Sequence, residues 1–571
     1  MSKQWILPEN GLPRDTAREL AASLCISETI AGLLWRRGLD SAQAMDVFLS
    51  PGLRHLMRPD AIAGMAEAAP LLAQALADGR SVAVWGDYDV DGITGTALLV
   101  DFLRGRGVNP RWHLPERTSE GYGLNFTGIE TLARDGVDVL VTVDCGISDL
   151  EAVARARELG LTVIVTDHHL PGPELPPAQV VVNPKLAPGG PGTDLAGVGV
   201  AFFLAAALNR LLPGEPTDIR RLLDLVALGT LADVVPLRGQ NRILAKNGLL
   251  LLAEASRPGI YALKEVCGHN PTASLTASQV TFGLAPRINA AGRMGRPDAA
   301  LALLLAPDLD TARPLAAILD AENTRRRAEE DTILAEAMDQ AKAQPDRFGL
   351  TLYGPHWHQG VIGIVASRVA EARYRPTLIL TEDTSRGLLK GSGRSIPECD
   401  LHALLTEIQD VLAGFGGHRQ AAGLSILPEN LPLLVERFEA AARSALGPVA
   451  PQPSLKVDGE LSFGAVGATL VRELSLLEPF GCGNPEPVFA SPPVTVVSRR
   501  EFGDNHVVLS VRDVEAGVTL RAKAWRMADA IGPEWTGTLA RIAYSPKITY
   551  FSGVPEIELR LRDCCQGQTE R

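Results

Sequence analysis

The sequence predicts an α/β protein with a parallel sheet, a second and smaller α/β domain, and a C-terminal β-barrel. Three observations support this fold class. Short β-branched runs alternate with helical patterns between residues 61 and 235, a polar stretch without glycine fills residues 311–344, and several strand-like runs follow residue 451. A chain of 571 residues is too long for one hydrophobic core, so about three domains are expected.

The first region contains four short apolar runs, which are SVAVW, VDVLVTV, LTVIVT and AQVVVN. Helical patterns such as GIETLARDG separate them, which is typical of βαβ units and a parallel sheet. Ligands of such sheets bind beyond the carboxyl ends of the strands. We expect this domain to span residues 61–310, after an N-terminal segment of residues 1–60.

The segment 311–344 has no glycine, and its one proline, Pro314, lies near the start, where a helix tolerates it. Because polar residues surround it, we interpret it as a connector helix, within residues 311–346. The runs LTLYG, TLILT and GLLKGSGRSI then predict the smaller α/β domain, over residues 347–450. The five runs PVTVVSRR, HVVLSVRD, VTLRAKAWRM, TLARIAYSPKITYF and EIELRLRD predict a small closed barrel over residues 451–571.

Composition excludes few functions but narrows the class of protein. The longest apolar run, residues 195–208, is too short to span a bilayer, so we expect no membrane association. Seven cysteines without CxxC spacing suit reduced thiols in a cytoplasmic protein. The net charge of −12 argues against a uniformly basic surface, although a local groove for nucleic acid remains compatible with it.

The stretch VAVWGDYDVDGITG places Asp87, Asp89 and Asp91 between a strand-like and a helix-like run. Unpaired carboxylates at the edge of a core repel one another and lose hydration, and a divalent cation would remove both costs. Three further polar clusters fall at the ends of predicted elements. They are Asp144 in VTVDCG, Asp167, His168 and His169 in VTDHH, and Asp233 in LGTLADVVPL.

These clusters are expected to converge on one edge of the sheet. Oxygen ligands with a single imidazole suit Mn²⁺ or Mg²⁺ better than structural zinc. Two such ions, bridged by one carboxylate, stabilise the attacking and leaving oxygens in phosphoryl transfer. Each piece alone has an ordinary alternative: a DxD after a strand is often a helix cap, DCG is often a turn, and an HH pair is often on the surface. Taken together, the four clusters favour a metal site.

The ordered motifs GDYDVDG, VDCG, TDHH and LGTLADVVPL resemble those of the DHH phosphoesterase superfamily. Further on, PRINAAGRMG, WHQGVIGIVASRVA, GSGRSIP, GFGGHRQAAG and EPFGCGNPEPVF resemble the RecJ family of single-strand-specific exonucleases. The resemblance runs from about residue 50 to the end. It implies a DHH domain, a DHH-associated domain and an OB-fold barrel. It also implies metal-dependent degradation of single-stranded DNA, 5′→3′, to 5′-mononucleotides in DNA recombination and repair.

The resemblance implies roles for the acidic and histidine residues. One metal ion would be held by Asp87 and Asp144, and the other by Asp89, Asp144, His168 and Asp233. Asp144 would bridge the two ions.

The neighbouring residues have implied roles as well. His169 would face a phosphate oxygen or the nucleophilic water, and Asp167 would orient the two histidines. RecJ relatives often have a histidine two residues before the first aspartate; here Trp85 stands in that place, so no ligand is assigned there.

The resemblance also implies two substrate-binding groups. Gly416, Gly417 and His418 would form a loop against the phosphate backbone, with a plain turn as the alternative. The other group would bind a terminal 5′-phosphate, for which guanidinium groups are suited, and surface salt bridges are the ordinary alternative for its arginines. It consists of Arg293, Ser392 and Arg394.

Two further segments have open interpretations. The barrel aromatics Trp525, Tyr544, Tyr550 and Phe551 either stack on bases or fill the barrel. The run TRRRAEE, residues 324–330, is either a solvated helix face or a DNA-facing patch.

The expected partners are single-stranded DNA, a single-strand-binding protein and a repair helicase, and the protein is expected to be a monomer. Two other functions compete with the nuclease: a small-molecule or short-oligonucleotide phosphoesterase, and a replication scaffold without metals. The complete ligand set argues against the scaffold, and the barrel argues against the small-molecule enzyme.

Overall fold

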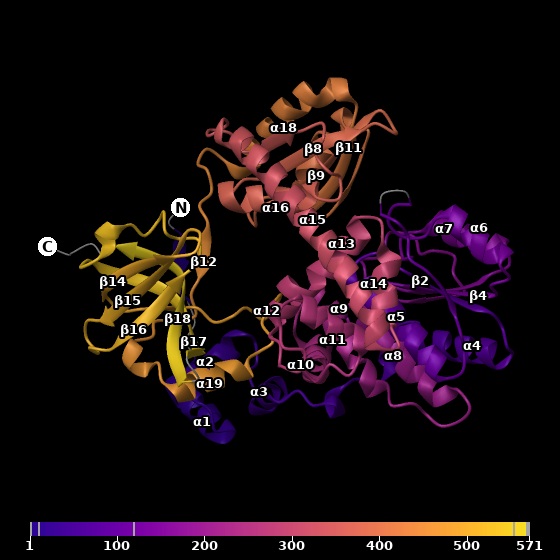
Figure 1. Cartoon of the computed structure of the whole chain (residues 1–571), viewed down its shortest axis with the longest axis horizontal. Helices are drawn as coiled ribbons and strands as arrows, with labels where there is room; N and C mark the ends of the chain where they lie inside the picture. Colours follow the sequence, from indigo (N-terminus) through magenta and orange to yellow (C-terminus); the bar gives the residue numbers. More distant parts are fainter. Residues whose placement is uncertain (1–2, 9–11, 118–119, 552–553, 567–571) are drawn as a thin grey trace.

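The computed structural model describes residues 3–8, 12–117, 120–551 and 554–566, without the side chains of Tyr550 and Phe551. Figure 1 shows a large helical and sheet-containing body, a smaller α/β body joined to it by the long helix α15, and a β-barrel beside them. This arrangement confirms the fold class predicted from the sequence.

The sheet of the first domain has five parallel strands in the order β3-β2-β4-β5-β6. They are β2 (Val82–Gly86), β3 (Arg111–His113), β4 (Val139–Val143), β5 (Thr162–Thr166) and β6 (Val180–Val182). The four predicted runs form four of these strands. The edge strand β3 was not predicted, because its three residues, RWH, carry neither an apolar run nor an alternating pattern.

Alternate residues of β2 face opposite layers of helices. Val82 and Val84 belong to one core with α4 (Met65–Ala77), α5 (Val90–Gly105), α8 (Gly197–Leu211) and α9 (Leu223–Ala232). Ala83 and Trp85 belong to a second core with α6 (Phe126–Arg134) and α7 (Leu150–Glu158). The sheet is therefore buried on both faces, as expected for parallel strands.

Further helices extend the larger of these cores. They are α10 (Gly239–Glu254), α11 (Pro258–Val266), α12 (Ala277–Gln279), α13 (Ala285–Arg293) and α14 (Pro297–Leu304). The apolar run at residues 195–208 lies mostly in the buried helix α8. In the described part of the chain, none of the helices combines the length and the apolar character that crossing a bilayer requires.

The connector is one continuous helix, α15 (Leu309–Lys342), whose first turn is capped by Asp308 through Thr311 N. One narrow stripe of the helix is buried. Ala316 and Leu319 pack in the first domain, whereas Ile333 and Ala337 pack in the second. The helix looks polar in sequence because only this stripe is buried.

The second domain is built on a mixed sheet in the order β10-β11-β9-β8-β7. Its strands are β7 (Leu350–Tyr353), β8 (Thr377–Asp383), β9 (Leu388–Arg394), β10 (Gly414–Gly417) and β11 (Ala421–Ile426). Its helices are α16 (Ile362–Arg373), α17 (Leu401–Glu407) and α18 (Leu431–Leu446).

The C-terminal barrel closes because β17 pairs with both β14 and β18, and β18 also pairs with β16. Its elements are α19 (Ala468–Leu476), β13 (Phe489–Ala490), β14 (Val494–Phe502), β15 (His506–Asp513), β16 (Thr519–Ala524), β17 (Leu539–Phe551) and β18 (Val554–Gln566). Tyr544 is fully buried and its hydroxyl donates to Leu461 O at 2.8 Å. This aromatic residue therefore fills the barrel and is not available for stacking on a base.

The N-terminal segment packs against the barrel. Ile30, Leu33 and Leu34 lie in the same core as the barrel residues. The segment forms β1 (Gln4–Ile6), α1 (Arg14–Leu24), α2 (Glu28–Arg36) and α3 (Ala42–Leu49), and β1 pairs with β12 (Ser454–Lys456). The N-terminal segment and the C-terminal barrel thus share one unit, which no local pattern indicates.

Arg242 of α10 joins three parts of the chain. Its buried guanidinium donates to Phe48 O at 2.8 Å and to the carbonyls of Leu476, Leu477 and Glu478 at 3.0 Å. Burial lowers the pKa of Arg242 to about 9, so the group remains charged at neutral pH. The first domain thereby holds both the N-terminal segment and the chain that leads into the barrel.

We expect Arg242→Met to lower the free energy of unfolding by about 3 kcal/mol or more, because several carbonyls lose their donor at about 1–3 kcal/mol each. Chemical denaturation monitored by circular dichroism measures this. Arg210→Met, which removes an exposed arginine of α8, is the control. Equal stability of the two variants would contradict the role of Arg242.

Candidate metal centre

The site lies where three neighbouring strands of the first domain end. Asp87 follows β2, Asp144 follows β4, and His168 and His169 follow β5. Because parallel strands present their carboxyl ends at one edge, these residues meet there although the sequence separates them widely. Asp233 reaches the same place from the end of α9.

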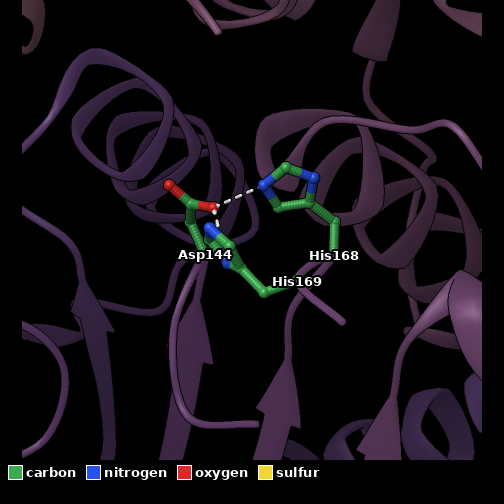
Figure 2. Close-up of side chains that lie close together, drawn as sticks. All are labelled: Asp144, His168 and His169. Atoms are coloured by element: carbon green, nitrogen blue, oxygen red, sulfur yellow. Dashed lines mark ion pairs between the residues drawn. The ribbon is translucent and has the colours of Figure 1, made fainter. Parts of the chain in front are cut away.

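The imidazole of His168 is surrounded by carboxylates. Its Nε2 lies 3.0 Å from Asp144 Oδ1, 3.6 Å from Asp233 Oδ2 and 3.8 Å from Asp91 Oδ2. Figure 2 shows the Asp144 carboxylate facing both His168 and His169, whose Nδ1 lies 3.8 Å away. Burial lowers the pKa of His168 to about 4, so the ring is neutral at pH 7 and able to coordinate a cation.

The potential ligand atoms form three overlapping groups, in each of which all atoms lie within 4.8 Å of one another. The groups are Asp87, Asp89 and Asp144; Asp91, His168 and Asp233; and Asp144, His168 and His169. All five residues expected to bind metal are therefore brought together. Asp144 and His168 each belong to two of the groups, so these two residues connect the three groups.

The electrostatics of the cluster are unfavourable without a cation. Burial and the neighbouring Asp89 raise the pKa of Asp87, and burial together with the charges of Asp91 and Asp89 raises the pKa of Asp144. Asp87 Oδ1 and Asp233 Oδ2 are buried and have no hydrogen-bond partner among the described residues. Buried oxygens of this kind are the ligands that Mn²⁺ and Mg²⁺ prefer, so the residues present fit a divalent cation.

The backbone around Asp144 is specialised. Asp144 has φ +63°, a left-handed conformation that is uncommon for any residue but glycine. The first residue of α8, Gly197, lies so close that a Cβ there would be 2.7 Å from Asp144 Cβ. Only glycine at position 197 allows α8 to approach the carboxylate in this way.

Two aspartates of the GDYDVDG motif also cap helices. Asp89 Oδ1 accepts from Asp91 N at 2.9 Å and Gly92 N at 3.1 Å, at the start of α5. Asp91 accepts from Gly197 N at 2.6 Å and Val198 N at 2.9 Å, at the start of α8. The helix-cap interpretation of the DxD pair therefore holds for Asp89 without excluding a role at the metal site. Asp91, not chosen from the sequence, links two helices across the site.

Asp167 orients the histidine pair. Its Oδ1 accepts from His168 N at 2.6 Å and His169 N at 3.0 Å and lies 2.8 Å from His169 Nδ1, while Oδ2 accepts from Ile147 N at 3.0 Å. Burial lowers the pKa of His169, but the hydrogen bond to Asp167 and the charges of Asp167, Asp233 and Asp89 together outweigh burial, so the pKa is raised.

Tyr122 is a second residue that the sequence did not single out. Its hydroxyl donates to Asp144 O at 3.0 Å and lies 3.3 Å from His169 Nδ1. It thereby ties the turn after β4 to the histidine pair. The motif EGYGL that contains it has the composition of an ordinary turn.

The residues expected to bind a terminal phosphate meet at the junction of the two α/β domains. Arg293 donates from one guanidinium nitrogen to Gly360 O at 2.8 Å, and Arg394 donates to Ser392 Oγ at 3.1 Å. Burial, followed by the charges of neighbouring arginines that include Arg394, lowers the pKa of Arg293 to about 10. Among the described residues, no carboxylate forms an ion pair with Arg293 or Arg394.

The glycine loop lies at the end of β10. Gly416, Gly417 and His418 are exposed, and a tight turn joins His418 N to Ala421 O at 2.8 Å. A side chain on Gly417 would collide with Ala421 O at 2.4 Å. The loop thus presents bare backbone to solvent. Among the described contacts, none joins His418 to a residue of the metal cluster.

Three family models match separate parts of the chain. The DHH family N-terminal domain matches residues 81–230, the DHHA1 domain matches residues 346–444, and the RecJ OB domain matches residues 457–563.

Curated relatives named "Single-stranded-DNA-specific exonuclease RecJ" match nearly the whole chain. The protein of Salmonella typhimurium is 36% identical over 570 residues, which is 96% of this chain and 97% of the relative. That of Bacillus subtilis is 36% identical over 88% of this chain, and this chain spans 63% of its length. The chain belongs to the RecJ family.

A solved RecJ structure has the same fold. The protein from Thermus thermophilus, crystallised with Mn²⁺, is 34% identical, with a TM-score of 0.84, over 99% of this chain and 80% of that one. Trp85, to which the sequence assigned no ligand role, is fully buried and its ring centroid lies 4.0 Å from that of His113. It packs on the core side of the sheet together with α6, so it contributes no ligand.

In metal-free buffer, we expect the imidazole of His169 to titrate above its ordinary value of 6.5, because Asp167 stabilises the protonated ring. The pair stabilises the fold fully below pH 6.5, and this contribution is lost as the pH rises through the raised pKa. NMR of isotope-labelled histidine measures the midpoint, which Asp167→Asn should lower. Asp60→Asn, which removes an exposed carboxylate, is the control, and an unchanged midpoint in Asp167→Asn would refute the assignment.

Proposed function

We propose that this protein is a metal-dependent exonuclease that degrades single-stranded DNA, 5′→3′, to 5′-mononucleotides in DNA recombination and repair. The observation that carries the proposal is the cluster of Asp87, Asp89, Asp144, His168 and Asp233, whose ligand atoms lie within 4.8 Å of their neighbours. Family membership supports the substrate, since the relatives are named as single-stranded-DNA-specific exonucleases.

The cofactor is Mn²⁺ or Mg²⁺, because the donors are oxygens with one neutral imidazole and include no thiolate. RecJ of Thermus thermophilus has been solved with each of these ions. We assign Asp87 and Asp144 to one ion and Asp89, Asp144, His168 and Asp233 to a second. When bound, such a pair stabilises the charge on the attacking and leaving oxygens of the phosphodiester.

The chain supplies orientation and a proton donor around these ions. Asp167 holds His169 by its Nδ1, which leaves Nε2 to meet a phosphate oxygen of the substrate. The hydrogen bond and the charge of Asp167 raise the pKa of His169, which favours the protonated ring as a donor to the negatively charged phosphate. Tyr122 restrains the turn that carries Asp144 and thus limits the movement of the shared ligand.

Polarity would come from the junction of the two domains. There Arg293, Ser392 and Arg394 are proposed to hold a terminal 5′-phosphate, which would place the first phosphodiester over the metal ions. The loop of Gly416, Gly417 and His418 would contact the following backbone. These arginines have no carboxylate partner among the described residues, which leaves their charge to an anionic ligand.

Single-stranded DNA is the substrate partner. We further propose that the protein acts as a monomer in the cytoplasm, alongside a single-strand-binding protein and a repair helicase. The closed barrel next to the α/β domains (Figure 1) favours a polymeric substrate over a small phosphate ester.

Release of labelled nucleotides from 5′- and 3′-labelled single strands tests the proposal. With Mn²⁺ or Mg²⁺ the 5′ label should appear first, blunt duplex should be cut slowly, and EDTA should stop the reaction. Loss of a residue that only orients a metal ligand costs up to about 100-fold, so Asp144→Ala should cost at least about that. Asp60→Ala is the control. Activity in EDTA, or full activity of Asp144→Ala, would reject the mechanism.

Among the barrel aromatics whose side chains the structure describes, Trp525 is the most exposed. Its side chain is half-exposed and packs edge-on against His506, with ring centroids 4.8 Å apart. Trp525→Ala should weaken binding of long strands by about 1–3 kcal/mol, the value of one stacked base, and leave the shortest substrates unaffected. Fluorescence anisotropy across strand lengths measures this, with the exposed Val497→Ala as the control. A loss independent of length would contradict stacking in the barrel.

A further inference from the structure

The buried stripe of the connector helix changes character in its middle. Ala316 and Leu319 are apolar where α15 packs on the first domain, and Ile333 and Ala337 are apolar where it packs on the second. Between them the same face carries Asn323, Arg326 and Glu330. Polar side chains are costly to bury without partners, so this stretch has a role other than packing.

Arg326 is only partly neutralised there. Its side chain is 12% exposed, and one of its guanidinium nitrogens lies 3.7 Å from Glu330 Oε2. The other oxygen of Glu330 lies 2.7 Å from Nε of Arg368, on α16. One carboxylate is thus shared by two guanidinium groups. Arg326 Nε is buried and has no hydrogen-bond partner in the part of the chain that the structure covers.

The position of Arg326 adjoins the group of arginines at the domain junction. Helix α15 packs against both α13, which ends at Arg293, and α16 (Figure 1). The N-terminal turn of α16 touches the same group, because a Cβ on Gly363 would lie 3.0 Å from Ser392 Oγ and 3.2 Å from a nitrogen of Arg394. Burial and the charge of Arg117 contribute most to lowering the pKa of Arg293 to about 10, and the charge of Arg326 contributes next.

The junction also adjoins the metal centre. A Cβ on Gly292 would lie 2.2 Å from Tyr88 O, so α13 directly contacts the residue between Asp87 and Asp89. An anion bound by Arg293 and its neighbours would therefore lie next to the acidic cluster.

The positive charge of the arginines at this junction suits an anion that carries more than one negative charge. A phosphate monoester carries about −1.5 to −2 charges at neutral pH, whereas an internal diester carries one and a terminal hydroxyl none. We propose that Arg326 is a further substrate-binding residue, which contacts a terminal 5′-phosphate together with Arg293 and Arg394 and favours phosphorylated 5′ ends. This inference rests on the proposed function and assigns a residue of the connector helix to its substrate site.

Glu330 is a positioning residue in this scheme. By pairing with Arg368 at 2.7 Å it fixes α15 against α16, and by contacting Arg326 it sets the direction of that guanidinium group. The neighbours Arg325 and Arg327 on either side of Arg326 are exposed. The sequence run TRRRAEE therefore contains one arginine directed into the protein and two directed to solvent.

Equilibrium binding of one short single strand, prepared with a 5′-phosphate or a 5′-hydroxyl, tests the proposal. Binding is measured by fluorescence anisotropy in EDTA, so that no strand is cut. The wild-type protein should prefer the phosphorylated strand, and Arg326→Gln should reduce the ratio of the two affinities by about tenfold, the value of one hydrogen bond between charged groups. Because both affinities come from one preparation, a partly unfolded sample leaves the ratio unchanged.

Arg325→Gln removes the same charge from the exposed face of the helix and should keep the wild-type ratio. Arg326→Lys keeps the charge without the planar fork and should give an intermediate ratio. A wild-type ratio in Arg326→Gln, or an equal loss in Arg325→Gln, would overturn the proposal. Failure of the proposed function has a different signature, because it would appear as absent nucleotide release with Mn²⁺ or Mg²⁺ whatever the binding ratio.

Discussion

The candidate metal centre depends on the repulsion among carboxylates, which the parallel sheet brings close together at one edge. Strands β2 and β4 are neighbours and run in the same direction, so Asp87 and Asp144, which follow them, meet at one edge. Burial raises the pKa of both, which means that the ionised cluster is unstable by itself. A divalent cation removes that penalty, and the close approach of α8 at Gly197 and the capping by Asp91 keep the cluster compact.

Buried charged side chains link parts of the chain in two places. Helix α15 packs on both α/β domains through a narrow apolar stripe and carries Arg326 and Glu330 where it passes between them. Arg242 has the corresponding role elsewhere in the first domain, where it binds backbone carbonyls of the N-terminal segment and of the chain entering the barrel. At the connector the Glu330 carboxylate joins α15 to Arg368 of α16, and at the second place one guanidinium group serves several backbone acceptors at once.

Much of the fold could be predicted because local sequence patterns determine its helices and strands. The β-branched runs became strands, the glycine-free segment became α15, and the strand-like runs after residue 451 became the barrel. Prediction failed where the pattern was too short, as in β3, or where the partner was distant. The packing of Ile30 and Leu33 on the barrel has no local signal, because an amphipathic helix shows that it has a partner but not which one.

For the site, the sequence by itself determined which residue types follow each strand, and thus the candidate ligands Asp87, Asp144 and His168. Only the tertiary structure decided how they meet: the 3.0 Å approach of His168 to Asp144, the contact of Tyr122 with the turn after β4, and the inward direction of Arg326. The reason is physical. Periodicity and turn chemistry act between residues a few positions apart, whereas distances between side chains are set by strand order and helix packing, which bring together residues far apart in the chain.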